Sequence, residues 1–343
     1  MTGGAETVLE TRELVKHFPV KEGLFARARA VHALDGVNLN LRRGETLAIV
    51  GESGCGKTTL AKCLMRLEEP TGGRIVLLGE DITHARKRAL RGLRRHMQII
   101  FQDPYASLNP RWSIGSIVAD PIRLHEPLGR RARRDKVAAL LQTVGLGAEF
   151  MDRHPHELSG GQRQRVAIAR ALAVGPSVII CDEPVSALDV SIQAQVINLL
   201  KRLQRDLGIA YLFISHDLAL VQHISNRIAV MYLGEVVELA ETRAIRQRRL
   251  HPYTQALFSA APVADPGAAA KKNRIILAGE VPSPLNPPPG CRFHTRCPYV
   301  QARCRGEAPA LRTVENRLVR CHFAGESGFS PMAIEPVTQG STP

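Results

Sequence analysis

The sequence predicts an α/β fold with a helical insertion and a small cysteine-containing C-terminal appendix. Strand-like and helix-like patterns alternate from Val8 to about Pro262, which is typical of a parallel sheet covered by helices. The strand pattern stops between Asp103 and Leu158, where helical periodicity takes over. A Pro- and Ala-rich stretch, Ala260 to Gly290, marks a boundary. We therefore expect a core domain at 1–262 with a helical subdomain at about 103–170, an appendix at 263–323 and a disordered tail at 324–343.

A glycine-rich loop lies between an apolar strand, Thr46 to Val50, and a helical pattern, Thr59 to Leu67. The loop fits G-x-x-x-x-G-K-[ST], and its backbone N–H groups can surround a phosphate at a helix N-terminus. Lys57 can reach the β- and γ-phosphate oxygens, and Thr58 can reach Mg²⁺. The sequence thus predicts a nucleoside triphosphate site whose loop residues are Gly51, Ser53, Gly54, Cys55, Gly56, Lys57, Thr58 and Thr59.

A second apolar run, Val178 to Asp182, ends in a carboxylate. We expect a buried parallel strand that delivers Asp182 to the metal at its carboxyl end. Glu183 follows immediately and is placed to orient or deprotonate the attacking water, which makes it the candidate general base. An acidic helix N-terminus is the alternative interpretation, but it would leave the phosphate loop without a metal partner.

Two helices are predicted in the second half of the core. Ser159 can cap a helix from Gln162 to Val174, and Gly160 and Gly161 then leave its first N–H groups free for a γ-phosphate. An ordinary helix start is the alternative. The second helix, Val190 to Leu207, has a core-facing apolar side made of Ile192, Val196, Leu199, Leu200, Leu203 and Leu207.

The order and spacing of these motifs resemble the ATP-binding subunits of ABC transporters. The resemblance implies that Gln102 is the family's Q-loop glutamine, a catalytic residue and Mg²⁺ ligand that touches the nucleotide. It further implies that His216, after the strand Ala210 to Ser215, contacts the γ-phosphate. It also implies an adenine-stacking aromatic near the N-terminus, for which Phe18 is the best match and His17 the rival.

The same resemblance implies an ATP site that is shared between two subunits. In the family, the helix start Ser159-Gly160-Gly161-Gln162 faces the phosphate loop of a second ATPase domain. Asp189, in the run Ser186 to Asp189, belongs to the loop that accompanies this contact. One chain carries one such set, so the site is completed only when two ATPase domains close on two ATP molecules.

Three further runs narrow the resemblance. Phe101 to Arg111, Val185 to Gln195 and His251 to Thr254 resemble the ATPases of oligopeptide and dipeptide importers, and more the second than the first of their two ATPases. This resemblance covers roughly residues 8 to 323. It implies a heterodimer with a sister ATPase, two membrane subunits and an external peptide-binding protein, with the peptide never touching this chain. A motor for another solute, such as nickel or a glycoside, stays open.

Charge and hydropathy constrain the location and the partners. The net charge of +14 suits a protein under an anionic membrane leaflet or one that touches nucleic acid. Aromatic content is 4%, without interleaved aromatic and basic residues, and neither a second cassette nor a long coiled coil is present, so a nucleic-acid-associated ATPase is disfavoured. Apolar runs stay well short of the roughly 18 residues that a membrane span needs. We expect a peripheral protein on the cytoplasmic face of the cell membrane.

Four cysteines gather near the C-terminus, at Cys291, Cys297, Cys304 and Cys321. A cytosolic location argues against disulfides and favours a metal or cluster. Pro298 after Cys297 is reminiscent of ferredoxins, and the resemblance to some importers of this type implies a [4Fe–4S] cluster. Zinc, with His294 or His322 assisting, and four reduced thiols remain the alternatives. A redox-regulatory protein is disfavoured by the complete catalytic set upstream.

Overall fold

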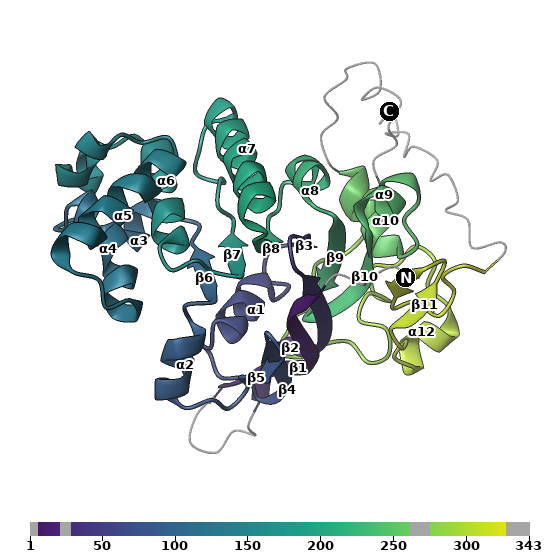
Figure 1. Ribbon diagram of the computed structural model, residues 1–343. Helices are drawn as coiled ribbons and strands as arrows, with labels where there is room; N and C mark the ends of the chain where they lie inside the picture. Colours follow the sequence, from purple (N-terminus) through teal and green to yellow (C-terminus); the bar gives the residue numbers. More distant parts are fainter. Residues whose placement is uncertain (1–5, 21–28, 261–274, 327–343) are drawn as a thin grey trace, which may run out of the picture.

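The computed structural model describes residues 6–20, 29–260 and 275–326, and two β-sheets form its frame (Figure 1). The smaller sheet is antiparallel, with the strand order β2-β1-β4-β5. Its strands are β1 (Thr7–Val20), β2 (Arg29–Arg42), β4 (Gly72–Leu77) and β5 (Glu80–Asp81). Apolar side chains of β1 and β2 share one core with helix α1 (Lys57–Leu64), so this sheet covers the helix that follows the glycine-rich loop.

The larger sheet has eight strands in the order β11-β12-β10-β9-β3-β8-β7-β6. Neighbouring strands from β9 to β6 are parallel, and every residue of β3, β7 and β8 is buried, which explains their continuous apolar sequences. The strands are β3 (Thr46–Val50), β6 (Met97–Ile100), β7 (Val178–Asp182), β8 (Ala210–Ile214), β9 (Arg227–Tyr232), β10 (Glu235–Glu241), β11 (Arg312–Val314) and β12 (Arg317–Val319). Because parallel strands end at the same edge, the segments after β3, β6, β7 and β8 meet there.

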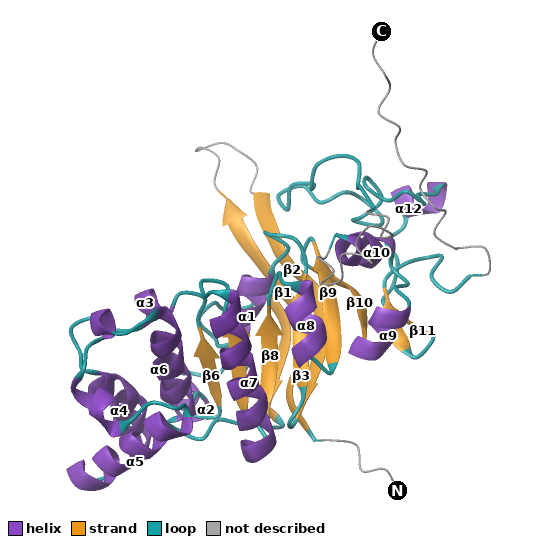
Figure 2. Ribbon diagram, turned by 90° about the horizontal axis from the view of Figure 1, so that it is seen from above, coloured by secondary structure: helices purple, strands orange, loops and turns teal. Residues whose placement is uncertain are grey.

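Two cores lie on opposite faces of this sheet. Along β3, Leu47 and Ile49 join the core with α1 and the antiparallel sheet, whereas Ala48 and Val50 join the core with α6, α7 and α8. Helices α3 to α6 form a group to one side of the sheet (Figures 1 and 2). Apart from α1, the helices are α2 (Lys87–Leu93), α3 (Pro104–Ser107), α4 (Ile114–His125), α5 (Arg130–Thr143), α6 (Gly160–Leu172), α7 (Val190–Leu207), α8 (Leu218–Ile224), α9 (Thr242–Gln247), α10 (Pro252–Ser259) and α12 (Ala302–Gly306), with 3₁₀ turns at Ala148–Asp152 and Pro155–Glu157.

The described C-terminal residues, 275–326, extend the larger sheet. Strand β12 pairs with β10, and β11 pairs with β12. Phe293 is 1% exposed, and its ring lies 5.3 Å from that of Tyr232 and 5.5 Å from that of Tyr253 between centroids. This segment therefore shares a core with the rest of the chain. Most of the tail expected to be disordered, 327–343, lies outside the described residues.

No helix in the described part of the chain has both the length and the apolar content that a membrane span requires.

Candidate active site

The phosphate loop joins β3 to α1 and folds around the side chain of Lys57. Its Nζ donates hydrogen bonds to the backbone oxygens of Gly51 at 2.8 Å and Glu52 at 2.9 Å. Gly56 has a φ of +106°, and a Cβ there would lie 2.3 Å from the backbone oxygen of Ala33, so only glycine fits this close approach to β2. The loop thus brings an ammonium group to a helix N-terminus, an arrangement that binds anions such as phosphates.

Asp182 ends β7 beside the phosphate loop, and its carboxylate accepts a hydrogen bond from the Thr58 hydroxyl. Burial raises the pKa of Asp182 and the charge of Glu183 raises it further, while Thr58 and Lys57 lower it in part. A divalent cation would offset this repulsion, and carboxylate and hydroxyl oxygens are donors that Mg²⁺ prefers. The residues present therefore fit the expected Mg²⁺.

Glu183, which follows β7, contacts side chains that follow two other parallel strands of the larger sheet. Its carboxylate accepts a hydrogen bond from Gln102 Nε2 at 3.0 Å and lies 3.2 Å from His216 Nδ1. Gln102 follows β6, Glu183 follows β7 and His216 follows β8. Glu183 itself has a φ of +49°, a backbone conformation that costs about 1–3 kcal/mol and is found where neighbouring structure enforces a functional geometry. The Glu183 side chain is 18% exposed and that of His216 65% exposed, so both remain open to solvent.

A cavity of about 560 Å³ connects these groups to the antiparallel sheet. Its walls come from β1, β2, the phosphate loop, the three strand ends and the C-terminal segment. The lining residues are Phe18, Val31, Ala33, Ser53, Gly54, Gly56, Lys57, Thr58, Thr59, Gln102, Glu183, His216 and Pro284. Phe18 thus borders the cavity, whereas the His17 ring is hydrogen-bonded to Asp35 at 2.8 Å.

The predicted helix start at Ser159 lies on a different surface. Ser159 caps α6, accepting a hydrogen bond from the Gln162 backbone N–H at 3.3 Å, and α6 begins at Gly160, two residues before the predicted start. A Cβ on Gly161 would lie 2.6 Å from Cγ2 of Ile192, so the glycine lets α6 approach the first turn of α7. The described residues that line the cavity include neither Asp189 nor any of residues 159–162. These residues therefore do not complete the ATP site of their own chain.

Sequence reasoning missed several residues of this site. Val31, Ala33 and Pro284 form cavity wall without any chemical signature that would mark them in the sequence. The Tyr253 hydroxyl accepts the Glu52 backbone N–H at 2.8 Å, although His251 to Thr254 attracted attention only as a family-specific run. Periodicity and motif spacing could not find the Tyr253–Glu52 contact, because it joins residues 201 positions apart.

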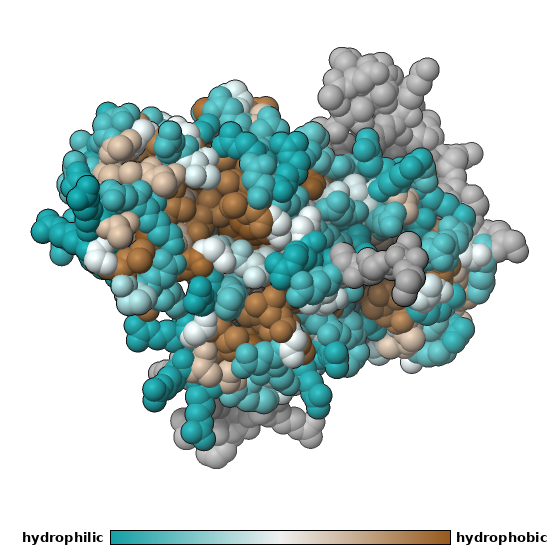
Figure 3. All heavy atoms as spheres, viewed as in Figure 1, coloured by the Kyte–Doolittle hydropathy of each residue, from teal (hydrophilic) through white to brown (hydrophobic). Residues whose placement is uncertain are grey.

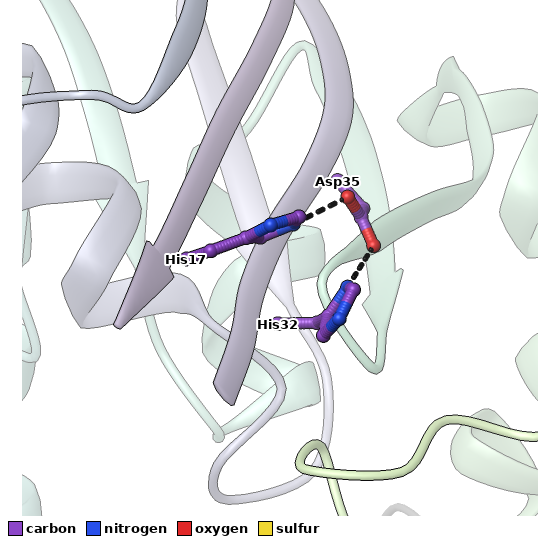
Figure 4. Close-up of side chains that lie close together, drawn as sticks. All are labelled: His17, His32 and Asp35. Carbon is purple, nitrogen blue, oxygen red and sulfur yellow. Dashed lines mark hydrogen bonds and ion pairs between the residues drawn. The ribbon is translucent and has the colours of Figure 1, made fainter. Parts of the chain in front are cut away.

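The four C-terminal cysteines are free thiols packed near Phe293 and His251. Burial raises the pKa of Cys291 to about 11 and that of Cys297 to about 12. Within the described residues, the set whose ligand atoms converge within 4.8 Å is His17, His32 and Asp35, and it contains none of these cysteines (Figure 4).

Two regions of the chain match known protein families. Residues 34–186 match the family described as ABC transporter, and residues 237–304 match the oligopeptide/dipeptide transporter C-terminal region. The oligopeptide transport ATP-binding protein AppF of Bacillus subtilis is 51% identical, over 93% of this chain and 98% of its own length. The dipeptide transport ATP-binding protein DppF of Escherichia coli is 49% identical, over 95% and 97%. A solved dimer of the ATP-binding cassette MJ0796 bound to ADP and Pi, 30% identical, superposes with a TM-score of 0.61 over 69% of this chain and 99% of its own.

These comparisons correct one prediction. The family descriptions and the names of the relatives specify ATP binding and transport and give no support to an iron–sulfur cluster. The prediction of a [4Fe–4S] cluster at Cys291, Cys297, Cys304 and Cys321 is therefore wrong, and zinc at the same residues is equally unsupported. The error came from treating four clustered thiols as ligands, although free cysteines also pack as small apolar side chains, as Cys291 and Cys297 do against the core here.

Both sequence and fold agree on the assignment. The α/β core with its phosphate loop is the ABC ATPase fold, and relatives of nearly the same length are about half identical. The chain therefore belongs to the ABC transporter family, in its oligopeptide and dipeptide branch, and is an ATPase.

Proposed function

We propose that this ATPase powers the uptake of dipeptides and oligopeptides across the cytoplasmic membrane. Support comes from the C-terminal match at residues 237–304 and from relatives, 49–51% identical, that are named for peptide transport. The observation that carries the catalytic part is the meeting of Gln102, Glu183 and His216 beside the phosphate loop in one cavity. A nickel or glycoside motor has no comparable support in these matches.

In this proposal, ATP occupies the cavity with its phosphates on the loop. Lys57, which now contacts backbone oxygens, turns to the β- and γ-phosphate oxygens. Phe18 stacks on the adenine, as its place in the cavity wall supports. Thr58, Asp182 and Gln102 are the residues that would hold Mg²⁺, which would offset the charge of the phosphates. The remaining loop contacts come from Gly51, Ser53, Gly54, Cys55, Gly56 and Thr59.

Glu183 acts as the general base. Its carboxylate accepts the proton of the attacking water, while the Gln102 amide and the His216 ring keep it oriented through the contacts at 3.0 and 3.2 Å. His216 contacts the γ-phosphate, which its 65% exposed side chain can reach. The strained backbone at Glu183 fixes the carboxylate at the strand edge, where it faces the cavity.

We propose further that the site is completed by a sister ATPase in a heterodimer. Ser159, Gly160, Gly161, Gln162 and Asp189 lie outside this chain's own cavity, which is what a contact to a partner's nucleotide requires. Val190, next to Asp189, is 81% exposed, and Figure 3 shows apolar surface between α6 and α7. Two solved structures of one similar ABC cassette, MJ0796, are described as dimeric.

The membrane partners act through the helical group. Gln102 contacts Glu183 and leads directly into α3, so movement of α3 to α6 can be passed to the catalytic carboxylate. Exposed Phe101, Tyr105 and Trp112 near this joint offer apolar contact to two membrane subunits. The net charge of +14 suits a peripheral position on the cytoplasmic face, with an external peptide-binding protein acting only indirectly.

We divide the chain for function into the ATPase domain, 1–262, with its helical subdomain at about 103–170, and a C-terminal unit at 263–323. The separate family match supports a distinct C-terminal region, but it spans residues 237–304 and so begins within β10, before the proposed boundary, and β12 joins the sheet of the ATPase domain.

Reconstitution tests the proposal. The full chain is assembled with its sister ATPase, membrane subunits and binding protein in proteoliposomes, and uptake of a labelled dipeptide is followed with ATP inside. We expect uptake that requires ATP and stops with Glu183→Gln, while the exposed Glu241→Gln control transports normally. ATP-driven uptake of nickel or a glycoside in place of peptide would overturn the substrate assignment, and full uptake with Glu183→Gln would overturn the catalytic one.

A further inference from the structure

Two arginines of the C-terminal segment form ion pairs with residues that adjoin the lining of the ATP cavity in sequence: Glu52 precedes Ser53, and Asp35 follows Ala33 by two positions. Arg296 forms a two-pronged ion pair with Glu52, with Nη1 and Nη2 at 2.7 and 3.1 Å from the two carboxylate oxygens. Arg292 pairs with Asp35 and also donates to the backbone oxygen of Leu233. The two ion pairs join positions more than 240 residues apart in sequence, so they attach the C-terminal segment beside the nucleotide site.

The contact at Glu52 acts on the phosphate loop itself, because Glu52 is its second residue. Three groups hold this residue: Arg296 at the carboxylate, the Tyr253 hydroxyl at the backbone N–H (2.8 Å), and Lys57 Nζ at the backbone oxygen (2.9 Å). The Arg296 side chain is 9% exposed, and its guanidinium lies 5.9 Å from the centre of the Tyr232 ring. The Glu52 side chain is 30% exposed, so the pair is half-buried, but its two-pronged geometry still restrains the start of the loop.

The contact at Asp35 lies beside the part of the cavity lining that β1 and β2 supply. The Asp35 carboxylate accepts hydrogen bonds from His17 Nε2 at 2.8 Å and His32 Nδ1 at 2.9 Å, and Figure 4 shows both rings directed at it. Burial opposes its ionisation, but the bonds from Arg292, His32 and His17 outweigh burial and lower the pKa of Asp35 to about 2. With Arg292 already on this carboxylate, the three residues form a satisfied network rather than a cation site.

A third contact places Pro284 of the C-terminal segment at the cavity. The backbone oxygen of Pro284 accepts the His32 N–H at 2.9 Å, and Pro284 is part of the cavity wall with Phe18. Residues 284–296 thus touch the loop, the wall that carries Phe18 and the cavity interior.

We infer that residues 284–296 belong to the ATP site, and that Arg296 is a positioning residue that neutralises Glu52 and holds the phosphate loop ready for the triphosphate. A carboxylate within a loop that binds a tetra-anion opposes that binding unless a cation is paired with it. Arg296 supplies that cation from the C-terminal segment. The inference rests on the proposed placement of ATP on this loop.

The test measures ATP affinity on the full chain by titration calorimetry with MgATP. Arg296→Ala should weaken ATP binding about tenfold, because it leaves the Glu52 charge unpaired. Adding Glu52→Gln to Arg296→Ala should restore most of the affinity, which a general loss of structure would not allow. Arg303→Ala, which breaks an exposed arginine–glutamate pair in the same segment, is the matched control and should bind ATP normally.

Three further measurements make the result decisive. Arg296→Lys keeps the charge but loses the two-pronged geometry, and we expect it to weaken binding about threefold even if Arg296→Ala fails to fold. In the assembled heterodimer, the KM for ATP should rise while kcat is largely kept. Lys57→Ala reports on the placement of ATP: if it binds ATP normally, the proposed site is wrong. If Lys57→Ala loses ATP binding while Arg296→Ala and Arg296→Lys both bind ATP like the unaltered chain, or if Glu52→Gln fails to rescue, the inference is overturned.

Discussion

Acid should weaken the attachment of the C-terminal segment through one buried histidine. His251 caps α10, and its Nδ1 accepts the backbone N–H of Tyr253 at 3.1 Å, so the ring must be neutral at this atom. The His251 side chain packs beside Phe293, with ring centroids 5.7 Å apart. Burial lowers the pKa of His251 from its ordinary value of 6.5 to about 3, because a charged imidazole would lie in an apolar core next to Arg320.

The size of the effect follows from these two values. The unfolded chain binds a proton below pH 6.5, whereas the folded chain does so only near pH 3, so this contribution is full above pH 6.5 and is lost as the pH falls toward 3. Between pH 7.5 and pH 5.0 the loss is about 2 kcal/mol. His251→Asn keeps an oxygen acceptor at the cap but does not titrate, so it should lack this loss.

Urea unfolding at pH 7.5 and pH 5.0 measures the prediction. The free energy of unfolding of the unaltered chain should fall by about 2 kcal/mol more than that of His251→Asn. An equal loss in both proteins would place the acid sensitivity at groups other than His251.

Three further predictions concern the ATP site. Lys57→Ala should abolish measurable ATP binding in titration calorimetry, because it removes the cation of the phosphate loop; normal affinity would rule out that role. ATP hydrolysis by the purified chain should be weak alone and rise strongly on titration with the sister ATPase, and full activity independent of concentration would contradict a shared site. Gly161→Ala should lower the free energy of unfolding by about 1–3 kcal/mol in urea, since its Cβ would lie 2.6 Å from Ile192, whereas Gly92→Ala, with open space around it, should not.

Local patterns specified the central strands and the catalytic motifs well. Thr46–Val50 and Val178–Asp182 have the predicted bounds because buried parallel strands are continuous apolar runs ended by polar residues. Helix Val190–Leu207 also has its predicted bounds, but Leu207, assigned to the core face, is 57% exposed because it is the last helical residue before the left-handed Gly208. Helix ends depend on capping geometry, and α6 accordingly starts at Gly160 instead of Gln162.

Sequence patterns could not predict most contacts between residues far apart in the chain. The strand ends that bring Gln102 and His216 to Glu183 could be inferred, because a known motif order implies their meeting. The pairs Arg292–Asp35 and Arg296–Glu52 could not, since arginines carry no spacing signal when their partners lie more than 240 residues away. Four cysteines close in sequence gave a strong but misleading signal, because apolar packing uses the same residue type as metal binding.

The central claim is that Glu183 removes the proton of the attacking water in this cavity. Phosphate release by the assembled transporter, measured for the unaltered chain and for Glu183→Gln with ATP affinity determined on the same samples, tests it most directly. We expect turnover to fall by about 10²-fold or more with ATP affinity retained, and the dimer to stay closed on its nucleotide. Retained turnover in Glu183→Gln would contradict the claim.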